Sequence, residues 1–316
     1  GAVRHLARHA FDVADLGRLT LKGYDDPVRA YRVTRLRPAT TRFAAHAGQE
    51  PAPMVGRDDE FRQLATLWQA VEDGAGGRGL IVTGDAGVGK SRLVDSLSRT
   101  VAGRGRPVLT LQCSPYHANS AFHPVAQSVE RRLGNSRTRP RERLAALERL
   151  VVAAGVAPER TAFAAAALGL PYETVYGPIV AAPRAARAET ARVLAATLAS
   201  LGRGGLIVAE DLHWADSGTL EVLDALVDLL PETPTLMLAS HRRNEAPRWQ
   251  AGLWLGTVRL DPLTEADGRG IVEAVAGSDA ISKALAREIV RKADGVPLFI
   301  EELTKAIVST HLPDAG

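Results

Sequence analysis

The chain has 316 residues, of which 46% are hydrophobic and 24% charged. This balance is typical of a soluble globular protein and excludes wholesale disorder, a collagen-like repeat and a disulfide-stapled fold. The 39 Lys and Arg residues exceed the 36 Asp and Glu residues by three, a surplus too small to indicate nucleic-acid binding. A single cysteine, Cys113, allows no intrachain disulfide and no cysteine cluster for zinc. No apolar run approaches a membrane span, and the N-terminus lacks the apolar stretch of a signal peptide, so we expect a cytoplasmic protein.

The N-terminal stretch, residues 1–35, has a pattern typical of two paired strands. Apolar residues alternate in LGRLTLKG and PVRAYRV, on either side of the turn-like residues 23–27. So short a stretch buries too little apolar surface to fold securely alone. Residues 36–53 carry three prolines and small polar residues, which predicts a linker.

Apolar runs and helical patterns alternate from residue 54 onward. Buried strands are expected at 80–84, 107–113, 205–211, 235–240 and 256–260. Helices are expected at 57–73, 91–103, most of 125–203, 264–277 and 281–295, with a short helix after Pro297. This alternation predicts an α/β fold: a five-stranded, mainly parallel sheet covered by helices. The core would span residues 54–260, with a helical insert at 114–204, and a helical lid would span 261–316.

The strongest motif follows the first of these strands and reads Gly84-Asp85-Ala86-Gly87-Val88-Gly89-Lys90-Ser91. It fits the Walker A pattern of a phosphate-binding loop (P-loop), G-x-x-x-x-G-K-[ST]. Glycines let such a loop curl so that backbone N–H groups face an anion, and the next helix presents its free N–H groups there too. Lys90 can reach the β- and γ-phosphates, and the Ser91 hydroxyl can ligate Mg²⁺. A glycine-rich turn without a ligand is the weaker alternative, because Lys90 is one of only five lysines in the chain.

An acidic pair ends the third predicted strand. The run LIVAED places Glu210 and Asp211 after a buried apolar stretch, at the sheet edge where ligands bind in open α/β folds. We expect Glu210 to hold the metal through water and Asp211 to orient or deprotonate the attacking water. The commoner order is Asp before Glu, so the opposite division of roles also fits. A surface Glu-Asp pair without a function is the other alternative.

Further polar residues near this edge have two interpretations each. His213 and Asp216 either help to order the metal site, or Asp216 or Ser217 caps the following helix. Of the two arginines that follow the fourth predicted strand, Arg242 is the better candidate for a cationic sensor of the γ-phosphate. The alternative is a pair of solvated arginines.

Five blocks in order resemble the AAA-type ATPase domain of the STAND signalling NTPases. They are Pro53-Met54-Val55-Gly56-Arg57, GDAGVGKS, Cys113-Ser114-Pro115-Tyr116-His117, VAEDLHWADSGTLEVLDAL and DGVPLFIEEL. More narrowly, they are similar to the version that follows class III adenylate or guanylate cyclase domains in bacterial regulators. The resemblance covers about residues 54–310.

The resemblance extends to both ends of the chain. Residues 16–33 resemble the C-terminal tail of such a cyclase domain, through Leu16-Gly17, Leu21-Lys22-Gly23, Pro27-Val28, Tyr31 and Val33. The cyclase metal aspartates and substrate-specifying residues would lie upstream of Gly1, so we expect no cyclic-nucleotide synthesis from this chain. Family members continue into helical-repeat sensor regions, which would follow Gly316. A cyclase upstream and a sensor downstream are therefore the implied partners in cis.

The resemblance also implies which residues bind the nucleotide. Val55, Gly56 and Arg57 would lie near the adenine, and Gly295-Val296-Pro297 looks like the GxP motif that packs against the nucleotide from the lid. The expected nucleotide-binding residues are Val55, Gly56, Arg57, Gly84, Asp85, Ala86, Gly87, Val88, Gly89, Lys90, Ser91, Arg92 and Pro297. The expected Mg²⁺ ligands are Ser91 and Glu210, and the expected catalytic residues are Asp211, Glu210 and Arg242.

Together these features predict an ATP-binding switch with slow Mg²⁺-dependent hydrolysis of ATP to ADP. The choice of ATP rests on the resemblance, and the sequence has no guanine-reading Asn-Lys-x-Asp segment. One alternative is the ATPase domain of a LuxR-like transcriptional regulator, but we find no helix-turn-helix with a basic recognition face, so nucleic acid is not an expected partner. The other is a non-hydrolysing scaffold, which the intact Gly89-Lys90-Ser91 and Glu210-Asp211 disfavour. The resemblance also allows a homo-oligomer that assembles with nucleotide.

Overall fold

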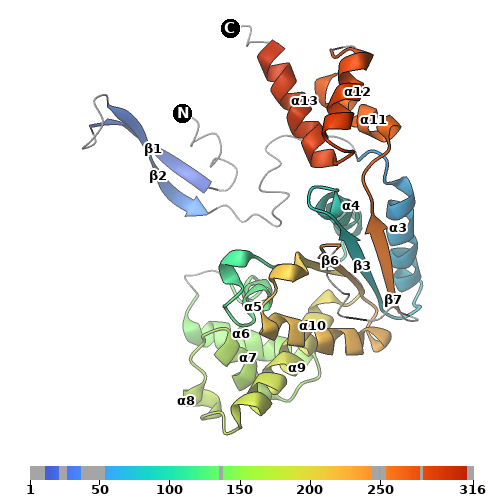
Figure 1. Ribbon diagram of the computed structural model, residues 1–316. Coiled ribbons are helices and arrows are strands. Elements are labelled where there is room, and N and C mark those ends of the chain that lie inside the picture. The colour runs from blue at the N-terminus through green and yellow to red at the C-terminus, as the bar shows by residue number, and fades with distance from the viewer. Residues whose placement is uncertain are drawn as a thin grey trace. The chain divides into compact units, whose positions relative to one another are not determined.

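The computed structural model describes residues 11–20, 27–36, 54–134, 138–243, 249, 254–277 and 280–311. The chain divides into two compact units, Gly1–Ala52 and Pro53–Gly316, and Figure 1 labels most of their elements. Residues 21–26, which hold most of the predicted turn, and nearly all of the predicted linker lie outside the described residues.

The first unit contains an antiparallel pair of strands, β1 (Phe11–Leu19) and β2 (Val28–Leu36). Asp15 lies opposite Tyr31, and an ion pair of 2.6 Å joins Asp15 to Arg29 across the pair. The register shifts between Asp15 and Arg18, where Gly17 adopts a positive φ of 76°. The alternating pattern thus indicated strands on both sides of the turn, but β1 begins at Phe11, five residues before the run LGRLTLKG in which the first strand was expected. Two strands alone are marginally stable in water.

The second unit is built on a sheet of five parallel strands, which confirms the predicted α/β fold. The strands are β3 (Arg78–Gly84), β4 (Val108–Gln112), β5 (Leu206–Glu210), β6 (Leu236–His241) and β7 (Leu255–Leu260). Their spatial order is β4-β5-β6-β3-β7, and every neighbouring pair is parallel. This order brings together the carboxyl ends of β5, β6 and β3, which carry the acidic pair, the predicted sensor and the glycine-rich loop.

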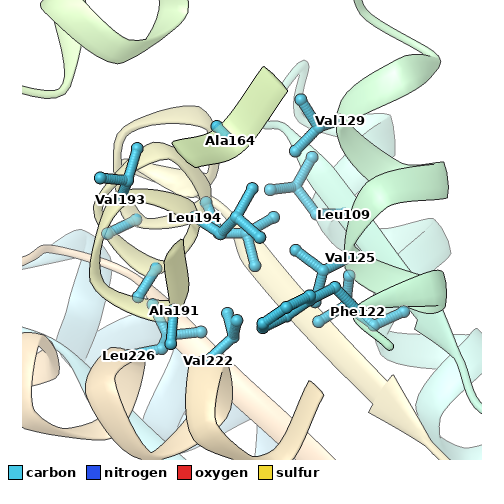
Figure 2. Packing of buried hydrophobic residues seen from close by; sticks show 14 of the residues in the cluster. Leu109, Phe122, Val125, Val129, Ala164, Ala191, Val193, Leu194, Val222 and Leu226 are labelled. Atoms are coloured by element: carbon cyan, nitrogen blue, oxygen red, sulfur yellow. The ribbon is translucent and has the colours of Figure 1, made fainter. Parts of the chain in front are cut away.

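Helices cover both faces of this sheet, and its three central strands, β5, β6 and β3, are buried along nearly their whole length. One face packs against α3 (Asp58–Glu72) and α4 (Lys90–Gly103) through a cluster that includes Trp68, Leu93 and Val208. The other face packs against α5 (His123–Glu130), α6 (Pro140–Ala153), α7 (Thr161–Ala167), α9 (Pro183–Gly202) and α10 (Ser217–Leu229). Figure 2 shows this second cluster, in which Leu109 of β4 and Val125 of α5 meet Leu194 of α9. A short helix, α8 (Glu173–Tyr176), follows α7.

The predicted lid consists of three helices with a small core of their own. They are α11 (Glu265–Ala276), α12 (Lys283–Lys292) and α13 (Pro297–His311). Thr264 and Ser282 cap α11 and α12 by accepting backbone N–H bonds. The expectation of a short helix after Pro297 was wrong, because α13 has 15 residues. Proline starts a helix well, and neither glycine nor proline interrupts this one. Among the described residues, no helix has the length and apolar character needed to span a membrane.

Candidate functional site

The glycine-rich loop lies between β3 and α4, as the motif requires. Gly89 takes the N-cap position of α4 with a φ of 104°, and a Cβ there would meet open space. Gly87 also has a positive φ, 78°. Only glycine adopts these angles without strain, so the sequence keeps the loop curled and its backbone N–H groups close to the helix N-terminus.

Lys90 lies inside the loop and is only 8% exposed. Its ammonium donates hydrogen bonds of 2.8 Å to the backbone carbonyls of Gly84 and Asp85. Burial lowers the pKa of Lys90, and nearby Arg242 lowers it further, while the charges of Asp211 and Asp85 oppose the shift. A bound phosphate would add negative charge at this point and favour the ammonium form.

The acidic pair lies at the carboxyl end of β5, as predicted. Glu210 is the last residue of the strand and is 1% exposed. Asp211 follows in the left-handed region, at φ 57° and ψ 48°, which is uncommon for a residue other than glycine and clusters at functional sites. Its backbone N–H donates to the Ser240 hydroxyl of β6 at 3.1 Å. This bond ties the turn after β5 to the neighbouring strand β6.

Arg242 and Arg243 follow β6, and they contact different residues. The Arg242 guanidinium lies 6.0 Å from the ring centroid of Trp214, a cation–π distance, and its charge reaches Lys90. Arg243 approaches the loop itself, with ion-pair distances of 3.7 Å to Asp85 and 3.4 Å to Asp261. Arg242 is the predicted sensor, and Arg243 is a second arginine near the loop that the sequence pattern does not indicate.

Asp216 acts as a helix cap. Its carboxylate accepts hydrogen bonds from the Thr219 N–H at 2.9 Å, the Thr219 hydroxyl at 2.6 Å and the Phe122 N–H at 2.8 Å. These bonds begin α10 and also tie down the segment between β4 and α5, where Phe122 has a positive φ of 61°. Asp216 was expected either to order the metal site or to cap the following helix, and its hydrogen bonds to Thr219 support the helix cap. His213 lies in a short 3₁₀ helix with its ring 5.2 Å from that of Trp214.

The residues predicted to lie near the adenine connect the core to the lid. Arg57 is buried, and its guanidinium donates to the carbonyls of Val88 in the loop, at 3.2 Å, and of Asp261 after β7. Val55 packs against the apolar core of the lid. Gly56 has a φ of 67°, and a Cβ there would clash with the Asp267 side chain of α11.

The lid contacts the loop directly through the start of α13. The Leu298 N–H donates to the Gly87 carbonyl at 3.3 Å, and a Cβ on Gly87 would lie 3.0 Å from Val296. Glu301 forms an ion pair with Arg92 of α4, with both side chains largely buried. Pro297, predicted to face the nucleotide, is the first residue of α13.

The turn before α13 is held by backbone contacts. Gly295, at φ 66°, accepts a hydrogen bond of 2.8 Å from the Leu263 N–H. A Cβ on Gly295 would lie 2.5 Å from the Leu263 carbonyl oxygen, so no other residue fits. This turn fixes where α13 meets the loop.

These residues fit a nucleotide with Mg²⁺. The loop offers backbone N–H groups, a buried ammonium and open space beside Gly89, which is the chemistry of a phosphate cradle. Ser91 and Glu210 offer the oxygen ligands that Mg²⁺ prefers.

Sequence reasoning did not single out three residues that the structure places at this site: Gln112, Arg243 and Glu301. Gln112 is the β4 partner of Glu210 in the parallel register. Each of the three is a sequence neighbour of a residue in a quoted motif or of a predicted site residue, and this proximity is the only sign in the sequence that they belong to the site. Their partners are far away in sequence, and periodicity does not reveal such contacts.

Comparisons with known proteins give a relative in sequence and structures with a similar fold. The chain is 27% identical over 319 residues to an uncharacterized protein of Rhizobium meliloti (strain 1021), covering 98% of the chain and 30% of that protein's length. Cdc6p from Pyrobaculum aerophilum has a similar fold, with a TM-score of 0.50 and 14% identity over 84% of this chain and 64% of that one.

Two other solved structures are similar at lower scores. The Orc1 protein of Aeropyrum pernix, solved in complex with DNA, gives a TM-score of 0.48 with 16% identity over 84% of this chain and 63% of that one. The other is a Signal Transduction ATPase with Numerous Domains (STAND) protein with a tetratricopeptide repeat sensor, from Pyrococcus horikoshii. It gives a TM-score of 0.41 with 13% identity, over 84% of this chain and 34% of that one. Residues 53–238 match the family described as the AAA ATPase domain. Because this match covers more than half of the chain and contains the glycine-rich loop and the acidic pair, the chain belongs to the AAA ATPase domain family.

Proposed function

We propose that the chain is an ATP-binding switch that hydrolyses ATP slowly and uses the bound nucleotide to set the position of its lid. The observation that carries this proposal is the contact between α13 and the loop, through Leu298 on Gly87 and Glu301 on Arg92. A ligand in the loop therefore acts on residues that also hold the lid. A ligand shifts a conformational equilibrium only when it interacts differently with the two states. A nucleotide that fills the loop would meet this condition by changing its contact with α13.

The hydrolysis step assigns one role to each residue of the acidic pair. Mg²⁺, held by Ser91 and Glu210 when bound, would neutralise phosphate charge. Asp211 would orient a water molecule whose oxygen forms a bond to the γ-phosphorus, while the bond from that phosphorus to the β–γ bridging oxygen breaks. The water proton passes to the Asp211 carboxylate, and ADP leaves with the bridging oxygen. Lys90 and Arg242 would offset the negative charge on the phosphates.

We infer a slow rate from the positions of the charged groups. Arg242 lies on Trp214, and Arg243 is held by Asp85 and Asp261, so either arginine must leave a partner to approach a phosphate. A slow step keeps the ATP state populated for long enough to serve as a signal.

The test is the nucleotide content and turnover of the purified chain. Denaturation and chromatography would identify co-purified ATP or ADP, and phosphate release would be followed with and without Mg²⁺. We expect bound adenine nucleotide and a turnover well below that of a metabolic enzyme. Nucleotide binding without any Mg²⁺-dependent release would support a scaffold instead, and no binding at all would refute the proposal.

A second part of the proposal concerns a longer protein in which this chain would lie between a cyclase and a sensor. The β1–β2 pair carries Leu16-Gly17, Val28, Tyr31 and Val33 of the cyclase-like tail, and Pro27 comes directly before β2. The chain spans 30% of the length of its Rhizobium relative. We infer that the ATPase regulates a nucleotide cyclase on its N-terminal side in response to a helical-repeat sensor on its C-terminal side. In a longer protein with this chain and a cyclase, Lys90→Ala should change cyclic-nucleotide output without touching the cyclase site, and unchanged output at saturating ATP would argue against the coupling.

A further inference from the structure

Three polar side chains share one face of the sheet at its carboxyl edge. Successive side chains of a strand point to opposite faces. In β5, Leu206 and Val208 pack in the cluster formed with α3 and α4, so Glu210 lies on that face too. The same alternation places Gln112 of β4 and Ser240 of β6 there. The face is the one covered by α4, the helix that starts at Lys90.

The register brings Gln112 next to the acidic pair. Gln112 is the partner of Glu210 between β4 and β5. One step beyond the paired Ala209 and Ala239, the Ser240 hydroxyl binds the Asp211 N–H. Glu210 thus lies between an amide on one side and a hydroxyl on the other.

The Gln112 carboxamide is buried without a hydrogen-bond partner in the part of the chain that the structure describes. Both its nitrogen and its oxygen are shut off from solvent. A buried amide without partners is costly, and native proteins seldom leave one in place without a reason. The apolar residues of the same strand, Leu109 and Leu111, show that β4 packs well without polar groups.

We propose that Gln112 is a positioning residue for the metal–nucleotide complex, and this inference rests on the proposed function. When Mg²⁺ and nucleotide are bound, the Gln112 amide would hydrogen-bond a water molecule held beside the Glu210 carboxylate. An amide suits this place because it offers two N–H donors and a carbonyl acceptor. It also carries no charge, so it neither repels Glu210 nor competes with it for the metal.

The test compares Gln112→Leu with a matched control, Thr110→Val. Both changes replace a polar side chain with an apolar one on the same face of β4, but only Gln112 lies at the carboxyl edge. Three quantities would be measured for each variant and the wild type: the thermal midpoint without ligand, ADP affinity in EDTA and with Mg²⁺, and the turnover of ATP. The ratio of the two ADP affinities reports on the metal site without relying on catalysis.

For Gln112→Leu we expect an unchanged or higher thermal midpoint and an ADP affinity in EDTA within about twofold of wild type. The gain in ADP affinity from Mg²⁺ and the turnover should each fall at least about tenfold. Thr110→Val should match wild type throughout. If Gln112→Leu fails to fold, Gln112→Met, which is flexible and apolar, replaces it with the same readouts.

The outcomes separate this inference from the function on which it rests. Wild-type protein that binds no Mg²⁺–nucleotide would overturn both. Wild-type protein that binds and hydrolyses ATP, alongside a Gln112 variant with the same Mg²⁺ gain and the same turnover, would overturn the role of Gln112 alone.

Discussion

Lys90 makes its hydrogen bonds within the glycine-rich loop, where we propose that a phosphate binds. Lys90 donates to two loop carbonyls at 2.8 Å, and burial lowers its pKa. The folded chain therefore bears a cost for this charge in the absence of a ligand. The negative charge of a phosphate in the loop would offset this cost, so Lys90 should account for a large part of the binding free energy.

Lys90→Ala should remove ATP binding while leaving the fold intact. Hydrogen bonds to charged groups contribute about 1.5–3 kcal/mol each, so the loss of affinity should be on the order of hundredfold or more. Lys292→Ala is the control, because Lys292 is exposed and pairs only with Glu288 of its own helix among the described contacts. ATP titration and circular dichroism would be compared. An affinity that Lys90→Ala leaves unchanged would rule out the phosphate-binding role of the loop.

Asp211→Asn should keep ATP binding and slow hydrolysis by about a hundredfold or more, the range for loss of a general base. Asparagine preserves the size of the side chain and tolerates the left-handed backbone at this position. Asp228→Asn, an exposed position in α10, is the control. Single-turnover rates and Mg²⁺–ATP affinity separate the two roles. A collapse of Mg²⁺–ATP affinity with normal hydrolysis per bound ATP would assign the metal to Asp211 and reverse the roles of the pair.

Cys113 should be chemically inert in the folded protein. Burial raises the pKa of its thiol to about 12, and the charges of Asp216, Asp211 and Glu210 add to the effect. At pH 8 about one thiol in ten thousand would be ionised, and the thiolate is the reactive form. A thiol reagent at pH 8 should therefore label Cys113 only after unfolding in guanidinium. Rapid labelling of the native protein would contradict this.

The same shift predicts how stability changes with pH. The folded state favours the neutral thiol, whereas the unfolded thiol ionises near its ordinary value of 9.0. Raising the pH above 9 therefore favours the unfolded state, until the folded thiol also ionises near 12. Denaturant midpoints measured between pH 8 and 10.5 should fall more steeply for wild type than for Cys113→Ala.

At the scale of elements, the segment between β4 and α5 depends on α10. Asp216 caps α10 and also binds the Phe122 N–H. Asp216→Ala should therefore destabilise the fold by about 2–4 kcal/mol, since it removes a cap and leaves a second buried donor unpaired. Ser282→Ala, which removes only the exposed cap of α12, should cost about 1 kcal/mol. Urea denaturation of both variants measures the difference, and equal losses would show that the link to Phe122 adds nothing.

The elements that sequence reasoning predicted well are those whose causes are local. The run 80–84 and its four counterparts are short and apolar, so their identity as buried strands follows from hydropathy. The span 125–203 was predicted only as mostly helical, because a stretch such as TAFAAAA of α7 is apolar on all sides and has no clear period. The length of α13 was missed because Pro297 marks where a helix starts and says nothing of where it ends.

The site divides in the same way. The residues of the loop and the acidic pair follow from spacing within a motif. The approach of Arg243 to Asp85, the bond from Leu298 to Gly87 and the left-handed turn at Asp211 depend on contacts between distant segments. No periodicity or spacing in one sequence encodes such contacts, so they emerge only when the sheet and lid are assembled.

At the scale of the whole second unit, two anchors join the lid to the nucleotide loop. One is the backbone bond from Leu298 to Gly87, and the other is the ion pair between Glu301 and Arg92. The pair is largely shielded from solvent, so removing one partner leaves the other charge poorly solvated and costs more than breaking a surface pair. Together with the Gly295 turn, these anchors make α13 the element that we propose responds to the occupancy of the loop.

Mg²⁺–ADP should therefore protect the lid as well as the loop from hydrogen exchange. Ligand at a hundredfold excess over its dissociation constant stabilises the folded form by about 2.7 kcal/mol. We expect slower exchange at residues 84–91 and also at 285–305. Protection confined to 84–91 would exclude the lid as the switching element.

Glu301→Gln should uncouple the two regions. It removes the charge that pairs with Arg92, so ADP should still protect 84–91 while the added protection at 285–305 shrinks. Glu302→Gln is the matched control: it makes the same change one residue along α13, where the carboxylate pairs with Lys305 of the same helix and is exposed. The control should behave as wild type. Equal protection of the lid in both variants would mean that the ion pair does not transmit the nucleotide state, and the backbone bond between Leu298 and Gly87 would then carry the coupling.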